Sequence, residues 1–134
     1  MRSGWLLAAG LVVAVPAGVA AQAEILGRWH GTSTCVKESW NASCNDERIV
    51  YDFVPSAAGA PGVLLHAYKV VGSDTVSMGD LELLPDSGAG RWAGEFSNSR
   101  VHIRWMYQVR DSSLTGTLGV YPELRVARHV VARR

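Results

Sequence analysis

The sequence predicts an all-β protein, an eight-stranded antiparallel up-and-down barrel that follows a cleaved export signal. Two observations support the barrel. Apolar and polar residues alternate with a period of two over most of the chain after residue 24, and short turns rich in Gly, Pro, Asn, Asp and Ser separate eight such segments. Because an open sheet of this size would leave two edges unpaired, closure into a barrel is favoured.

Residues 1–23, MRSGWLLAAGLVVAVPAGVAAQA, have the three parts of a secretory signal peptide. Arg2 precedes an apolar run over 5–15, and small residues then end in an A-x-A cleavage pattern at 21–23. A membrane anchor is the alternative, but the run is broken by Gly and Pro and is shorter than the roughly 20 apolar residues that span a bilayer. We therefore expect an exported protein, periplasmic or extracellular, with a single mature domain over 24–134.

The first predicted strand carries the stretch LGRWHGTSTC, and the second carries RIVYDFVP. From the second strand onward the separating turns are, in order, AAGAPG, GSD, PDSGAG, SNS, DSS and PE. Turns this short join neighbouring antiparallel strands, so the strands form a meander. The predicted strands are 25–35, 48–55, 62–71, 75–84, 91–97, 100–110, 114–121 and 124–133.

The sixth strand, 100–110, shows the alternation most clearly. One face is dry and the other wet, as in an antiparallel sheet with a single buried side. The interior of an eight-stranded barrel is just wide enough for side chains or for one small ligand. The dry face carries Val101, Ile103, Trp105, Tyr107 and Val109.

The charge balance and the placement of charged residues argue against nucleic-acid binding and against a membrane-spanning barrel. Without Arg2, the chain has twelve basic and twelve acidic residues, so it carries no electrostatic footprint of a nucleic-acid-binding protein. A barrel that spans an outer membrane has an apolar outer face. The polar faces here carry several arginines, so we do not expect an integral membrane protein. These arginines are Arg104, Arg110, Arg125 and Arg133.

The chain has two cysteines, Cys35 and Cys44. Export and an even count favour a disulfide that closes a short loop. In the chain-entropy model such a loop contributes on the order of 2–3 kcal/mol to stability. The loop also holds Trp40, which is a candidate anchor for a protein partner.

The triplet G-R-W occurs at 27–29 and again 63 residues later at 90–92, each time with a further Gly two residues after the Trp. Glycine permits a sharp bend and close approach of another backbone. We therefore expect Trp29 to plug the floor of the barrel, with the glycines making room for its ring. We interpret the second copy as a bend point on the opposite side of the barrel.

LGRW at the start of an exported eight-strand meander resembles the G-x-W motif of the calycins, the superfamily of lipocalins and avidins. The resemblance implies that the Trp packs against an Arg or Lys from the last strand. Arg128 lies on an otherwise apolar face of the eighth strand, so we expect a cation–π contact between Arg128 and Trp29. The stretch SLTGTLGV over 113–120 also resembles the small-residue strands of avidin-type barrels.

Two related folds share parts of this pattern. Nitrobindin-like haem barrels begin with G-x-W-x-G, as GRWHG does here, and place a His near the C-terminus on the iron. His129 is near the end but shares its face with Arg125 and Arg133, so we expect it to point outward. Small periplasmic inhibitors of bacterial metalloproteases are also exported barrels with an early disulfide and G-x-W, but the N-terminal tail that they use is almost absent here.

Catalytic motifs are missing from the sequence, and we expect neither an enzyme nor a metal or other cofactor. Asp80 and Glu82 share one face of the fourth strand, and His66 falls beside Tyr68. Such polar groups on a strand are more typical of a solvated face or of a rim than of acid–base catalysis.

The sequence leaves two functions open. In the first, the barrel interior binds a small apolar ligand, since pockets of this kind are mostly apolar with a few polar anchors. In the second, the same side chains fill a solid core and the protein binds a secreted protein, either as a protease-inhibitor-like barrel or through another part of its surface. The side chains concerned are Tyr51, Phe53, Trp92, Phe96, Ile103, Trp105 and Tyr107.

Overall fold

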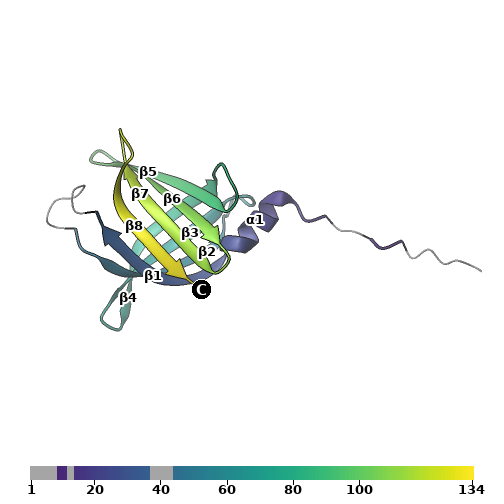
Figure 1. The fold of residues 1–134 in the computed structure, drawn as a ribbon, viewed down its shortest axis with the longest axis horizontal. Helices are drawn as coiled ribbons and strands as arrows, with labels where there is room; N and C mark the ends of the chain where they lie inside the picture. Colours follow the sequence, from purple (N-terminus) through teal and green to yellow (C-terminus); the bar gives the residue numbers. More distant parts are fainter. Residues whose placement is uncertain (1–8, 12–13, 37–43) are drawn as a thin grey trace, which may run out of the picture.

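The computed structural model describes residues 9–11, 14–36 and 44–134. Eight antiparallel strands follow one another around a closed barrel, and β8 pairs with β1 to complete it (Figure 1). The predicted fold is therefore confirmed, with strand ends within two residues of the expected ones. The elements are α1 (Ala17–Ile25), β1 (Gly27–Cys35), β2 (Glu47–Pro55), β3 (Val63–Val71), β4 (Asp74–Pro85), β5 (Arg91–Ser97), β6 (His102–Arg110), β7 (Ser113–Val120) and β8 (Arg125–Arg133).

One end of the barrel is filled by large apolar side chains, and we call it the closed end. Ile25, Phe53, Trp29 and Trp92 are at most 2% exposed there. In Figure 1, α1 lies against this end and the C-terminus of the chain is beside it. Burial of such side chains stabilises the fold by roughly 1.5–3 kcal/mol each.

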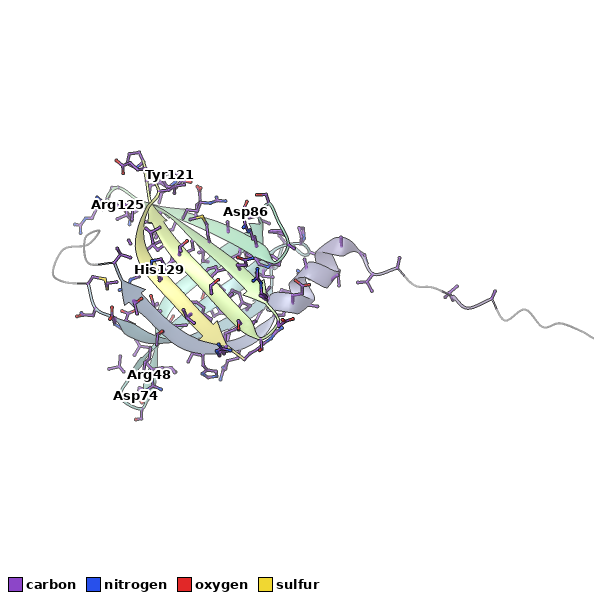
Figure 2. The ribbon with its side chains drawn as sticks, in the orientation of Figure 1. Arg48, Asp74, Asp86, Tyr121, Arg125 and His129 are labelled. Atoms are coloured by element: carbon purple, nitrogen blue, oxygen red, sulfur yellow. A yellow bond between two sulfur atoms is a disulfide. The ribbon has the colours of Figure 1, made fainter. Side chains whose placement is uncertain are left out.

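Polar side chains project from the outer face of the barrel, as period-two alternation requires. Figure 2 shows His129 and Arg125 on the outside of β8 and Asp74 at the tip of the β3–β4 hairpin. No helix among the described residues is long and apolar enough to cross a membrane.

Both G-R-W copies begin with a glycine of positive φ. Gly27 and Gly90 have φ values of 117° and 70°, in the left-handed region that favours glycine. The Gly two residues after each Trp lies where strands press together. A Cβ on Gly31 would be 1.9 Å from the carbonyl oxygen of Val131, and one on Gly94 would be 2.4 Å from that of Glu82.

The order of strands places β1 and β5 on opposite sides of the barrel. Trp29 and Trp92 therefore enter the closed end from opposite walls, each beside a glycine that lets its strand approach a neighbour. The two copies thus lie on opposite sides of the barrel, as expected.

The predicted partner of Trp29 is wrong. Arg134, one residue beyond β8, places its Cζ atom 4.4 Å from the centre of the Trp29 ring, and its Nη1 donates to the carbonyl of Leu26. Arg128 pairs in register with Cys35, at the end of β1 that is remote from Trp29. Alternation with period two places Arg128 and Arg134 on the same, inward face of the last strand. Their positions along the strand differ, and only Arg134 lies at the height of Trp29 in the barrel.

The helix α1 overlaps the stretch predicted as a signal peptide. Gln22 in α1 donates from Nε2 to the carbonyl of Gly62 at 2.7 Å, and the side chain of Ile25 is fully buried. The Trp29 indole N–H donates to the carbonyl of Ile25 at 2.9 Å. The end of the helix and the floor Trp thus form one unit.

Replacing Trp29 with Ala should lower the free energy of unfolding by about 3–5 kcal/mol, because the change empties a fully buried site. Chemical denaturation monitored by far-UV circular dichroism measures this. A variant as stable as the wild type would show that the ring does not seal the floor.

Replacing Gly31 with Ala should destabilise the barrel, since the new methyl group would clash with the β8 backbone at Val131 and Ala132. The matched control is Thr32→Ala, on the exposed face of the same strand. Thermal melts should show a fall for Gly31→Ala that exceeds the control by several degrees, and equal melting temperatures would contradict the close approach.

Candidate functional site

The end of the barrel opposite the closed end is hollow, and we call it the open end. It holds a cavity of about 460 Å³, within the range of roughly 300–1,000 Å³ that is usual for small-molecule sites. All strands except β7 contribute to its lining. The lining residues are Ser33, Glu47, Tyr51, Leu65, Ala67, Met78, Gly79, Asp80, Leu81, Phe96, Ile103, Trp105, Tyr107 and Arg128.

Five of the seven side chains that the sequence proposed for a ligand site line this cavity. They are Tyr51, Phe96, Ile103, Trp105 and Tyr107. The other two, Phe53 and Trp92, are buried in the core and do not reach the cavity. The barrel is thus filled at one end and hollow at the other. The expected filled core describes the closed end, and the expected cavity describes the open end.

Aromatic rings form the floor of the cavity. Tyr51, Phe53 and Tyr107 meet edge to face with ring centres 5.9–6.1 Å apart, and the Trp105 ring lies parallel to that of Tyr107 at 5.8 Å. Gly116 on β7 makes room for this cluster, because a Cβ there would be 2.6 Å from the Tyr107 ring. The packing of the rings against one another fixes the shape of the floor.

Two buried phenols meet in this floor. The Tyr107 hydroxyl donates to the Tyr51 hydroxyl at 3.5 Å. Burial raises the pKa of Tyr51 to about 12 and that of Tyr107 well above its ordinary value, since the phenolate form would lose its hydration. Both phenols are neutral at physiological pH, and both tyrosines line the cavity.

Arg128 lies at the open end and joins it to the disulfide. The predicted bond between Cys35 and Cys44 is confirmed. Arg128 donates from Nη1 to Ser33 Oγ at 3.0 Å, and from Nη2 to the carbonyl of Asn45 at 2.9 Å and to Cys44 Sγ at 3.3 Å. Its guanidinium therefore holds the end of the disulfide loop against the barrel wall.

Glu47 faces the same guanidinium from β2 at a longer distance. Its Oε2 is 3.9 Å from Arg128 Nη1, and its side chain is 25% exposed. Among the described residues, no hydrogen-bond donor contacts the Glu47 carboxylate. The carboxylate thus retains free acceptor positions at the cavity.

The wall is incomplete between β4 and β5. These strands pair only at Leu84 with Ala93 and at Pro85 with Trp92, whereas β3 and β4 pair along nearly the whole hairpin. Toward the open end, Met78 and Phe96 line the cavity and are 42% and 49% exposed. The separation of β4 from β5 is therefore a route from solvent to the cavity.

The sequence did not indicate Met78 as a cavity residue, because Met78 itself interrupts the alternation of β4. A bulge on β4 pairs Gly79 with Ala67 and then Ser77 with Tyr68, which leaves Met78 as the extra residue. The φ of 109° at Gly79 permits this. A glycine within an alternating strand is the sequence signal that could have indicated the bulge.

The other polar candidates lie outside the barrel or at its rim. His66 Nδ1 and Asp80 Oδ1 are 2.6 Å apart, while Glu82 is exposed on the outer face of β4. His129 is exposed on the outer face of β8, as expected. Trp40 lies outside the described residues. No group of three potential metal ligands occurs within the described part of the chain.

A larger hollow of about 780 Å³ lies outside the barrel at the closed end, around the turns at 87–91 and 108–111. Two of its lining residues are Arg110 and Asp111, which belong to an exposed turn. The interior cavity remains the better candidate, because its walls are apolar and come from seven strands.

The chain is similar in structure to Rv2717c from M. tuberculosis, whose crystal structure superposes with a TM-score of 0.54. The match covers 90% of this chain and 99% of that one at 11% sequence identity, so it shows a shared fold alone. Neither the protein-family models nor the curated proteins give a match.

The raised pKa of Tyr51, about 12 against 10.0, predicts loss of stability in alkali. Below about pH 10 the phenol is neutral in both states. Above that, the unfolded chain ionises first, so the free energy of unfolding falls as the pH rises through about 12. Urea titrations across this range should give a shallower fall for Tyr51→Phe, while Tyr68→Phe, outside the buried core, should keep the wild-type dependence.

Proposed function

We propose that this protein is an exported barrel that binds a small, largely apolar ligand in the cavity at its open end. The single observation that carries the proposal is the aromatic-walled hollow of about 460 Å³ above a filled floor. A floor made of mutually packed rings gives the cavity a defined shape without the ligand, and a preformed site reduces the entropic cost of binding.

The composition of the lining supports an apolar ligand with few polar contacts. Leu65, Leu81 and Ile103 complete the walls between the aromatic rings. Polar groups are confined to the paired hydroxyls of Tyr51 and Tyr107 at the floor and to a set near the mouth that includes Glu47. Pockets that recognise small molecules have this mixture of apolar walls and sparse anchors.

Two further inferences accompany this proposal. The G-x-W strand, the eight-stranded meander and a cation over the Trp ring support a calycin-like relationship, with Arg134 in the position that we had expected for Arg128. The disulfide and the leader-like residues 1–23 support export. We propose no catalytic role, since the polar groups of the cavity do not form a nucleophile–base pair.

The second candidate is a protein-binding barrel similar to the periplasmic inhibitors. The exposed apolar side chains of Val71, Val76 and Phe96 at the open end favour it. The cavity distinguishes the two candidates, because an inhibitor that acts by its surface does not require a hollow interior.

Replacing Ala67 with Phe should abolish binding, because the ring would occupy the cavity from the β3 wall. The matched control is Ala57→Phe, in an exposed turn outside the barrel. Quenching or shift of tryptophan fluorescence by a panel of apolar probes measures binding, and Trp105 in the wall is the reporter. If Ala67→Phe binds the probes as the wild type does, the ligand does not occupy this cavity.

A further inference from the structure

The charges at the cavity define a preference for one kind of ligand. Among the described residues, its lining contains one basic residue, Arg128, and two acidic residues, Glu47 and Asp80. The Asp80 side chain pairs with His66 on the outer face of the sheet, so Glu47 is the acidic side chain of the interior. An anion would therefore be favoured only if Arg128 were available to it. The hydrogen bonds of Arg128 decide this point.

Arg128 is already engaged by the protein. Its Nη1 donates to the hydroxyl and to the carbonyl of Ser33, at 3.0 and 3.5 Å, and its Nη2 donates to Cys44 Sγ and to the Asn45 carbonyl. Its side chain is only 14% exposed. An incoming carboxylate would have to break these bonds and would approach Glu47 as well, and both effects oppose its binding.

Glu47, unlike Arg128, has unused hydrogen-bonding capacity. Its carboxylate accepts no hydrogen bond from a described residue, and its distance of 3.9 Å from Arg128 is at the limit of an ion pair. Asp80 pairs with His66 on the outer face and does not add a carboxylate to the interior. The acceptor capacity left unused inside the cavity is therefore that of the Glu47 carboxylate.

The aromatic walls of the cavity also favour a positively charged ligand. Trp105 and Phe96 line the cavity on neighbouring strands, β6 and β5. The face of an aromatic ring attracts a cation, most strongly for Trp. Burial of a charge against an apolar wall is unfavourable because the charge loses its hydration. Attraction between an ammonium group and the aromatic faces offsets part of this cost.

We propose that the cavity binds a cationic amphiphile, an amine whose ammonium group lies beside Glu47 and whose apolar body fills the space between Trp105 and Leu81. This inference rests on the proposed function and narrows it to a class of ligand. Glu47 is the specificity-determining residue, because an ammonium group forms an ion pair with it in addition to a hydrogen bond, whereas an alcohol can offer only the hydrogen bond and a carboxylate is repelled.

Three probes with the same naphthyl body test the proposal: naphthylethylamine, naphthylethanol and naphthylacetate. Binding to the purified protein is measured by calorimetry at neutral pH and low salt. The amine should bind about tenfold more tightly than the alcohol, and naphthylacetate should bind most weakly. Added salt should reduce the preference for the amine, since it screens the ion pair.

Glu47→Gln should remove the preference for the amine and leave the affinity for the alcohol unchanged, which also shows that the variant is folded. The matched control, Glu82→Gln, removes a carboxylate on the outer face of β4 and should retain the preference. A preference for naphthylacetate, or an amine-to-alcohol ratio that is independent of both salt and Glu47, would overturn the inference and leave the cavity as a binding site. If none of the probes binds, the proposed function itself fails.

Discussion

The barrel depends on the close contact between β1 and β8. At Gly31 the two backbones approach so closely that no other residue fits, and this contact closes the cylinder beside the buried Trp29 ring. The expectation that the glycines make room for the indole is wrong: a Cβ on Gly27 would have no heavy atom within 4 Å, and one on Gly31 would meet Val131 and Ala132 of β8. The indole N–H is satisfied by the Ile25 carbonyl. A closed barrel has no free edge along its wall, so the stability of this seam determines whether the remaining strands stay paired.

Side-chain size then divides the interior into two halves. Large side chains from opposite walls fill the closed end, while Ala67, Gly79 and Ser33 reduce the filling toward the open end. Arg128 spans the boundary between the hollow and the disulfide, and its bonds fix the loop end at Asn45 to the wall. These bonds engage the guanidinium, while the neighbouring Glu47 carboxylate accepts no hydrogen bond from a described residue.

Strand positions and the inward face could be predicted from period two and turn residues, because these features are local. The disulfide could be predicted from the even cysteine count together with the expectation of export. The pairing of Trp29 with Arg134 could not be predicted, because alternation gives the face of a residue and not its height in the barrel. Met78 and the separation of β4 from β5 depend on a bulge and on strand register, which are set by contacts between strands distant in sequence.

The junction between α1 and β1 has a consequence for maturation. Ile25 is part of the hydrophobic floor, yet it lies only two residues beyond the expected scission point after Ala23. A peptidase that cut there would remove Gln22, which bonds to Gly62, and would leave Ile25 in the hydrophobic floor. A cut a few bonds downstream would remove Ile25 and leave the closed end of the barrel unfilled. The position of proteolytic cleavage would therefore determine whether the mature barrel keeps its floor.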